Sequence, residues 1–169
     1  AAWYHLVVAK DTTQGTAANR LKLWVNGVAQ TFTGTSFPSE DFATGRINLG
    51  GKAQYVGSWQ NTNANYDGYM AEAHFLDGTV KAASDFGEYD SNGTWIPSEY
   101  TAGGYGNNGF YLDFADSGDL GDDESGNGND FAETNLATTD QSKDTPTNNQ
   151  ITFNPLNNQQ SGADSLAEG

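Results

Sequence analysis

The chain has 169 residues, enough for one domain of ordinary size, and only 36% of them are apolar. Its 22 acidic and seven basic residues give a net charge of −15, and this negative field repels phosphate backbones and argues against nucleic-acid binding. The absence of cysteine excludes disulfides and thiolate metal sites, and no apolar run approaches the ~20 residues that insert across a membrane.

The first 80 residues contain most of the strand signal. Runs of β-branched and aromatic residues predict five strands, over Trp3–Lys10, Arg20–Asn26, Val28–Thr33, Arg46–Leu49 and Tyr66–Leu76. Polar loops separate them, and no apolar 3.6-residue periodicity extends beyond about two turns. The chain is therefore predicted to be all-β. Because the first strand starts almost at residue 1, which is Ala rather than Met, we expect a processed product or a piece of a longer protein.

One hairpin in this region is specified with particular clarity. Asn26-Gly27 separates two strand-like runs, and this pair tolerates the positive φ angles of a two-residue type I′ turn. The turn fixes the register of the strand before it, whose side chains alternate between two faces. One face receives Leu21, Leu23 and Val25, and the other receives Lys22 and Trp24.

The remaining chain divides into two further segments. In residues 81–115, we expect one helical turn that ends at Gly87, an extended stretch before Pro97 and a short strand over Phe110–Phe114. From residue 116 onward the chain is polar and acidic, with too few large apolar residues to fold alone. The predicted organisation is thus a strand-rich unit over 1–80, a loop-rich extension with a short strand over 81–115, and a polar linker or the start of a following module over 116–169.

The acidic segment contains the cluster that most resembles a site. Its oxygen-bearing side chains and glycines are typical of a Ca²⁺ loop, and the candidate ligands are Asp123, Ser125, Asn127, Asn129 and Asp130. The spacing of Asp123, Ser125, Asn127 and Gly128 matches the opening of an EF-hand loop, but position 12 is Thr134 instead of a bidentate Glu. The alternative is a polar turn held by Asx hydrogen bonds.

Catalysis has little support in the sequence. The two histidines, His5 and His74, both lie in predicted strands, where packing or simple exposure is more common than catalysis. No Gly-x-Ser-x-Gly nucleophile motif is present. The best candidate for a glycosidase carboxylate pair, Glu88-Tyr89-Asp90, is expected in a loop and lacks a third acidic partner. We therefore expect a protein that is not an enzyme.

Aromatic side chains offer a second kind of site. Trp and Tyr rings stack on sugar rings, and the candidate glycan platform consists of Trp59, Tyr66, Trp95 and Tyr100, which flank two predicted loops. The alternative is that these rings pack in the core and at its rim.

Four segments together resemble a known family. The stretches Trp3–Val8, Leu21–Gly27, Ile47–Gly51 and Tyr66–Glu72 are similar, in this order, to the second half of a laminin-G-like module. Such modules belong to the concanavalin A-like lectin/glucanase superfamily, so the resemblance implies an antiparallel two-sheet jelly-roll sandwich. Residues 1–80 would be its C-terminal half, and the sandwich would be incomplete at the N-terminus because the strands expected before Trp3 are missing.

Two further motifs resemble one particular version of this module. Tyr105–Phe114 and Ser125–Asp130 look like the version of this module in virion and tail-fibre-like proteins of tailed phages. This implies a structural or adhesive module in a fibre, spike or capsid-decorating appendage, located in the virion or outside the cell. Its partners would be other virion subunits or copies of itself, and the alternative function is recognition of host-surface glycans. Because proteins that share a fold can have different functions, the structural role and the recognition of glycans both remain expectations.

Overall fold

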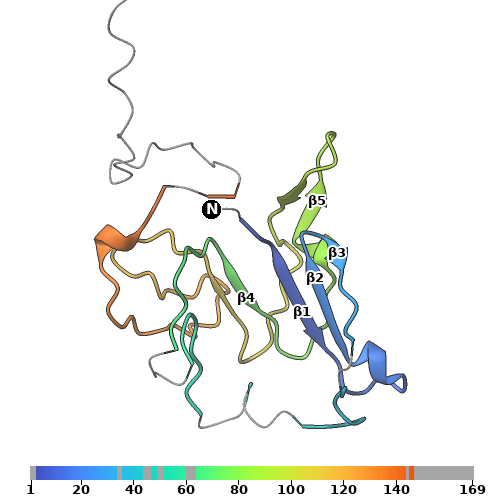
Figure 1. The fold of residues 1–169 in the computed structure, drawn as a ribbon. Helices are drawn as coiled ribbons and strands as arrows, with labels where there is room; N and C mark the ends of the chain where they lie inside the picture. The colour runs from blue at the N-terminus through green and yellow to red at the C-terminus, as the bar shows by residue number, and fades with distance from the viewer. Residues whose placement is uncertain are drawn as a thin grey trace, which may run out of the picture.

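The computed structural model describes residues 3–33, 36–43, 47–48, 52–59, 64–143 and 145–146. These residues form strands and 3₁₀ turns without an α-helix, which confirms the all-β prediction (Figure 1). The strands are β1 (Leu6–Lys10), β2 (Leu21–Val25), β3 (Val28–Ala29), β4 (Ala73–Phe75), β5 (Gly87–Tyr89), β6 (Trp95–Pro97) and β7 (Phe110–Leu112). The 3₁₀ turns are η1 (Ala17–Asn19), η2 (Ala83–Asp85) and η3 (Thr138–Asp140). No helix in the described part is long and apolar enough to cross a membrane.

The first sheet is a meander in the order β1-β2-β3. The φ angles of Asn26 and Gly27 are 48° and 77°, so both turn residues have the positive values that the sequence predicts. A side chain at position 27 would also overlap the ring of Trp95, which packs directly on the turn. The antiparallel register pairs Leu6 with Val25 and Val25 with Val28. The predicted hairpin is therefore confirmed.

Two smaller sheets complete the described part. β4 pairs with β7, and β5 pairs with β6, both in antiparallel register. The β4–β7 pairing joins the predicted strand-rich unit to the predicted extension, because His74 lies opposite Tyr111. All three sheets are small, and a two-sheet jelly roll stays a prediction.

Several predicted elements are shorter than expected or differ in kind. Of the strand predicted over Tyr66–Leu76, only β4 forms. Ile47 and Asn48 lie in a turn, while Arg46 and Leu49, the ends of another predicted strand, lie outside the described residues. Positive φ at Asn48, 59°, explains why this pair is not extended.

The segment after residue 80 also needs correction. The expected helical turn is a single 3₁₀ turn, η2, and Gly87 does not cap it but begins β5. Glu88 and Tyr89 were expected in a loop, yet they pair with Ile96 and Trp95 across the β5–β6 hairpin. Because Asp90 accepts hydrogen bonds from the main chain of Asn92 and Thr94, it holds the turn of that hairpin.

The apolar core is small. Its buried apolar side chains are Ala9, Ala83, Phe86, Leu112 and Leu120, and Leu112 is only 1% exposed. Leu120 belongs to the acidic segment, and the N–H of Glu124 in the same segment donates to Tyr111 of β7. The division of the chain into three segments stays a prediction. The apolar residues of the tail, from Ile151 onward, lie outside the described residues.

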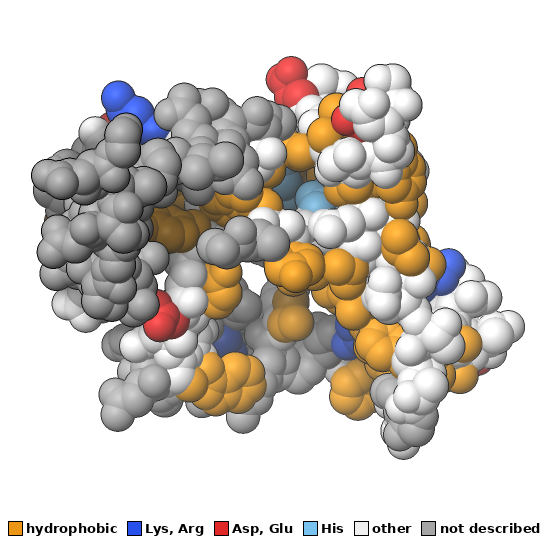
Figure 2. Space-filling view, turned by 45° about the horizontal axis from the view of Figure 1, so that its top comes forward, with side chains coloured by type: hydrophobic (Ala, Val, Ile, Leu, Met, Phe, Trp, Pro, Cys, Tyr) orange, Lys and Arg blue, Asp and Glu red, His pale blue; other side chains and the backbone are white. Residues whose placement is uncertain are grey.

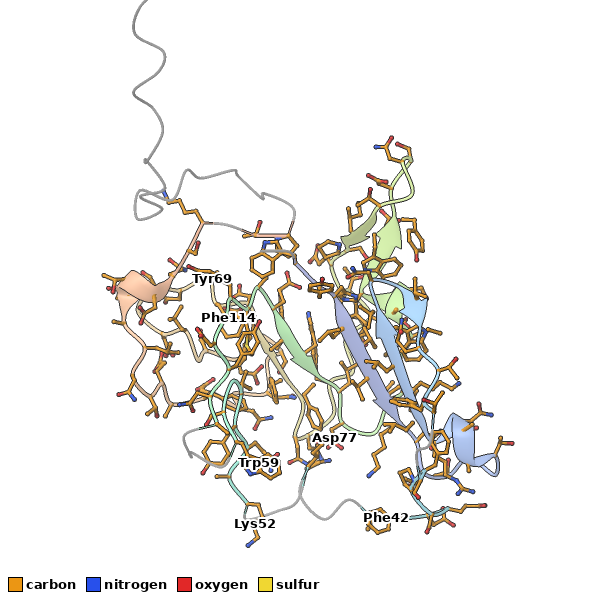
Figure 3. All side chains as sticks on the ribbon, in the orientation of Figure 1. Phe42, Lys52, Trp59, Tyr69, Asp77 and Phe114 are labelled. Carbon is orange, nitrogen blue, oxygen red and sulfur yellow. The ribbon has the colours of Figure 1, made fainter. Side chains whose placement is uncertain are left out.

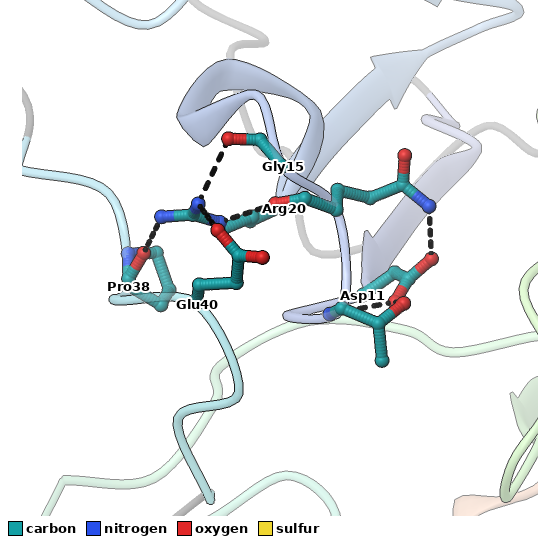
Figure 4. A network of polar contacts seen from close by, with 7 residues as sticks. Asp11, Gly15, Arg20, Pro38 and Glu40 are labelled. Carbon is teal, nitrogen blue, oxygen red and sulfur yellow. Dashed lines mark hydrogen bonds and ion pairs between the residues drawn. The ribbon is translucent and has the colours of Figure 1, made fainter.

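Two polar side chains, Arg20 and Asp123, are also buried. Arg20 precedes β2 and donates hydrogen bonds to three carbonyl oxygens, those of Gln14, Gly15 and Pro38, at 2.6–3.1 Å (Figure 4). Its Nη2 also lies 2.9 Å from Oε2 of Glu40. One guanidinium thus joins two loops that have no strands of their own, because its fork of donors reaches several acceptors at once.

Replacing Arg20 by Ala leaves these three carbonyl oxygens without their donor, and we expect the free energy of unfolding to fall by about 2–4 kcal/mol. The matched control is Glu40→Gln, which removes only the charge of a half-exposed carboxylate and should cost less than about 1 kcal/mol. Urea denaturation followed by tryptophan fluorescence measures both. Equal effects of the two variants would show that the ion pair, not the carbonyl contacts, stabilises the loops.

Candidate functional site

Aromatic rings collect around His74 on β4. The imidazole stacks on Tyr111 of β7, with ring centroids 4.2 Å apart and planes 7° apart. Tyr105 stacks on the same imidazole at 6.1 Å, and Phe86 lies 5.4 Å away. Tyr100 stacks in turn on Phe86 at 4.8 Å. The cluster ties the β4–β7 sheet to η2 and to the loop that follows β6.

A short series of polar side-chain contacts runs through this cluster. Nδ1 of His74 lies 2.9 Å from the hydroxyl of Tyr105, and Nε2 lies 3.4 Å from a carboxylate oxygen of Glu72. Burial is the main cause that raises the pKa of Tyr105 to about 12, and its neighbours Tyr100, Asp123 and Glu72 add to the rise. A phenol used as a nucleophile or base needs the opposite shift. The arrangement therefore fits hydrogen-bonded packing better than chemistry.

The second histidine, His5, packs against Trp95 with ring centroids 5.7 Å apart. Burial lowers the pKa of His5, and the nearby charge of Glu72 only partly opposes that shift. Nδ1 of His5 and Nε1 of Trp95 have no hydrogen-bond partner among the described residues. His5 thus serves the contact between the first sheet and β6, whereas His74 packs within the aromatic cluster.

The predicted cation loop is held by hydrogen bonds around Asp123. One carboxylate oxygen accepts from the main-chain N–H of Tyr111 and of Ser125, at 2.8 and 2.9 Å. The other accepts from the hydroxyl of Ser125 and the N–H of Asn129, both at 2.9 Å. Burial alone raises the pKa of Asp123, but these donors outweigh it and leave the pKa below its usual value.

Two asparagines fasten the same loop to the turn before β7. The side-chain amide of Asn127 donates to the carbonyl oxygens of Gly106 and Gly109 at 2.7 and 2.8 Å. The amide of Asn129 donates to the carbonyl oxygens of Asn107 and Gly109 at 3.1 and 2.9 Å. The polar turn with Asx hydrogen bonds, given above as the alternative to a Ca²⁺ site, is therefore present.

Calcium binding by this loop stays a prediction. Of the predicted ligands, Asp130 accepts a hydrogen bond from the N–H of Asp123, so its carboxylate lies at the loop's base. Within the described ranges, no group of three or more His, Cys, Asp or Glu side chains is close enough to hold a metal ion. A cation would have to use amide and hydroxyl oxygens, and it would compete for Asp123 oxygens that already accept hydrogen bonds.

The structure divides the predicted glycan platform into two groups. Trp59 and Tyr66 are 59% and 57% exposed and lie on two paired stretches of one loop, where the N–H of Tyr66 donates to Gly57. Trp95 and Tyr100 are instead half-buried, Trp95 against Gly27 and His5 and Tyr100 in the aromatic cluster. Trp95 and Tyr100 thus pack against other side chains, which is the alternative given above to a glycan platform.

A broad groove of about 1690 Å³ lies beside the first group. Its apolar lining includes Tyr55, Tyr66 and Tyr69 from the loop before β4, together with Phe75 of β4 and Phe110 of β7. Figure 2 shows a hollow bordered by hydrophobic side chains, and Figure 3 shows Trp59 and Tyr69 along the segment beside β4. Aromatic side chains at such a groove are suited to binding a ligand with flat apolar faces.

The first sheet has one packed and one open face. The packed face includes Val7, Ala9 and Trp24, next to His5 and its contact with Trp95. On the other side, a surface that we call the open face consists of Leu6, Val8, Leu21, Leu23, Val25 and Val28, with Lys10 at one end. Leu6, Val8 and Val28 are 63%, 66% and 55% exposed. Lys10, Leu21, Leu23 and Val25 of the same face are half-buried. The strand β1 thus has apolar side chains on both sides, and those on the open face are the more exposed.

The open face is not among the sites predicted from the sequence. The signal was present in Leu6-Val7-Val8-Ala9, an apolar run without the alternation of a strand that faces water on one side. Such runs are typical of strands that are buried on both faces. No family model, curated protein or solved structure matches the chain.

Replacing Asp123 by Ala leaves the N–H groups of Tyr111, Ser125 and Asn129 without their acceptor, so we expect a loss of about 2–4 kcal/mol in the free energy of unfolding. Because the pKa of Asp123 is lowered in the folded state, its contribution is complete above the ordinary value of 3.8 and disappears as the pH falls through the folded pKa. The measurement is urea denaturation between pH 7 and pH 2. The difference between the parent chain and the Ala variant should shrink below pH 3.8, and a constant difference would contradict this role.

Calcium can be tested on the unaltered chain. Because hydrogen bonds already use both oxygens of Asp123, we expect no change in Tm with millimolar CaCl₂ or with EDTA. A rise in Tm with CaCl₂ that EDTA reverses, and that Asp130→Asn abolishes, would instead show a cation site.

Proposed function

We propose that this chain is a non-enzymatic structural module that acts through contacts with other subunits or with copies of itself. The observation that carries the proposal is the open face. Soluble monomers rarely expose a contiguous apolar surface of this kind unless it is an interaction site. Its central side chains, Leu6 and Val8, come from a strand whose sequence is typical of burial on both sides.

The resemblance to laminin-G-like modules supports a finer form of this proposal. In a two-sheet jelly roll, the inner face of each sheet is apolar and packs on the other sheet. The open face has the character of such an inner face, which supports an incomplete sandwich whose second layer comes from a neighbour. The resemblance also supports a place in a phage virion, in a fibre, spike or capsid-decorating appendage.

The absence of an enzymatic role is part of the proposal. Its support is the environment of the two histidines, because His5 is packed on Trp95 and His74 is enclosed by tyrosines. Burial raises the pKa of Tyr105 and Tyr111 to about 12 for each, which is the opposite of the shift that a phenol acting as a base or nucleophile needs.

If the open face is an interaction surface, the purified 169-residue chain should self-associate at micromolar concentration. Sedimentation velocity over a hundredfold concentration range should show a defined oligomer that dissociates on dilution. Circular dichroism of the same samples controls for folding. A well-folded monomer throughout that range would contradict self-association and leave contact with other subunits as the only form of the proposal.

Carbohydrate binding is the second candidate, and the exposure of Trp59 and Tyr66 near the groove favours it. We expect Trp59→Ala to abolish any glycan binding with unchanged thermal stability, because more than half of this ring faces solvent. Trp95→Phe is the matched control, since Trp95 is half-buried and packs on His5. This variant should leave glycan binding unchanged. Glycan-array binding and thermal melting measure the two effects, and equal binding by the parent and Trp59→Ala would remove this candidate.

A further inference from the structure

A second, smaller pocket lies between the β2–β3 hairpin and the β5–β6 hairpin. Its volume is about 360 Å³, and its lining comes from both hairpins and from η2. The aromatic part of the lining consists of Trp24 of β2, Tyr89 of β5 and Trp95 of β6. None of the described residues that line it belongs to the open face or to the lining of the groove. A role for this pocket is therefore independent of the proposed function.

The contact between the two hairpins fixes two of these rings. The rings of Tyr89 and Trp95 have centroids 4.9 Å apart and planes at 75°, so they form a corner. The hydroxyl of Tyr89 donates to the carbonyl oxygen of Asn26 at 3.2 Å and so ties β5 to the turn between β2 and β3 (Figure 1). A side chain at Gly27 or at Gly87 would overlap the ring of Trp95, which occupies the space that these two glycines leave. The corner is thus part of the fold and does not need a ligand to form.

The third ring, that of Trp24, is not used in packing against other rings. It is half-buried, and no aromatic ring in the described part of the chain stacks on it. Two lysines that lie over rings do so elsewhere, Lys10 over Phe42 and Lys81 over Tyr100. Among the described residues, no lysine or arginine lines the pocket. The pocket therefore offers three aromatic rings without a basic side chain of its own.

The charges around the pocket favour a cation. Glu88 is the only charged residue in the described lining. The stretch 82–90, which supplies most of the lining, contains the carboxylates of Asp85, Glu88 and Asp90 and no lysine or arginine. Lys81 lies 3.8 Å from Asp85 and offsets that one charge. The whole chain adds a net charge of −15, and such a field raises the local concentration of cations.

We propose that this pocket binds the quaternary ammonium group of a small molecule between the rings of Trp24, Tyr89 and Trp95. The faces of aromatic rings attract a cation, and sets of such rings recognise quaternary ammonium groups. The volume is at the small end of ligand cavities, which are roughly 300–1,000 Å³, and it suits a compact head group.

Hydration separates a quaternary ammonium from a lysine side chain as the occupant. A primary ammonium is a compact, strongly hydrated charge. Because Tyr89 is 52% exposed, the pocket is open to solvent and has few polar groups to replace that hydration shell. The methyl groups of a quaternary ammonium hold water weakly and can contact the rings directly.

The first test uses choline as the probe and the unaltered 169-residue chain. The four tryptophans give four indole N–H signals in ¹H–¹⁵N NMR spectra, and Trp→Phe variants assign them. At constant ionic strength, millimolar choline should shift the signals of Trp24 and Trp95 saturably and leave that of Trp59, beside the groove, unmoved. The absence of a saturable shift at Trp24 and Trp95 would overturn the proposal.

A neutral ligand of the same shape tests the role of charge. In 3,3-dimethylbutan-1-ol, a carbon atom replaces the charged nitrogen of choline. This alcohol should bind at least about fivefold more weakly, because the rings attract the charge. Equal affinities would identify an ordinary apolar pocket and contradict a cation site.

Variants of Tyr89 test the corner itself. Tyr89→Leu removes the ring and should weaken choline binding at least about fivefold, whereas Tyr89→Phe keeps the ring and should stay within about twofold of the unaltered chain. Tyr66→Leu is the matched control, since Tyr66 is similarly exposed, at 57%, but lies beside the groove. This control should bind choline as the unaltered chain does.

Thermal melting of each variant controls for folding. Unchanged binding by Tyr89→Leu, or a loss in Tyr89→Phe as large as in Tyr89→Leu, would show that the ring does not hold the cation. If Tyr89→Leu fails to fold, the comparison of choline with its neutral analogue still decides the proposal.

Discussion

Because the strands are short, many main-chain N–H and C=O groups have no hydrogen-bond partner in a sheet. Buried polar side chains form hydrogen bonds with some of these groups instead. Arg20 satisfies three loop carbonyls at one end of the described part, and Asp123 accepts from three N–H groups at the other. A buried main-chain group without a hydrogen-bond partner lowers the free energy of unfolding. Removing either side chain should therefore destabilise the fold by more than the loss of its hydrogen bonds alone. The loops keep their shape through these two residues, since the apolar core is small.

The use of buried polar side chains to hold the loops explains why the candidate sites differ in kind. The polar cluster around Asp123 is saturated by the protein's own donors, so its composition serves folding. The exposed aromatic and aliphatic surfaces are different, because Leu6, Val8, Trp59 and Tyr66 each have more than half of their surface in solvent. The proposed functions therefore depend on the open face and on the groove.

The local features of the fold were predictable from sequence where short-range chemistry decides them. Asn26-Gly27 specifies a type I′ turn without help from the rest of the chain, and the strands on either side follow from it. The strand predicted over Tyr66–Leu76 was too long, because alternation alone does not show which residues find a partner. β4 extends only as far as β7 pairs with it, and that partner lies more than 30 residues away in sequence.

The site was less predictable for a related reason. Composition identified the loop at Asp123 but could not distinguish oxygen atoms that bind a cation from those that accept main-chain hydrogen bonds. Aromatic content could not separate Trp59, which is exposed, from Trp95, which packs on a turn and a histidine. Both distinctions depend on which distant segment lies alongside, as Gly106 and Gly109 do for Asn127.

Two of the four asparagines that precede glycine, Asn26 and Asn127, differ in how they use their amides, and this affects how the protein ages chemically. Asn26 accepts a hydrogen bond from the N–H of His5 through its oxygen, whereas Asn127 donates through its nitrogen to Gly106 and Gly109. Asparagine is among the thermolabile residues. Hydrolysis of the amide to a carboxylate preserves the acceptor at Asn26 but turns the donor at Asn127 into an acceptor facing two carbonyl oxygens. Where the product is aspartate, the β2–β3 hairpin thus keeps its hydrogen bond from His5, and the loop around Asp123 loses two hydrogen bonds.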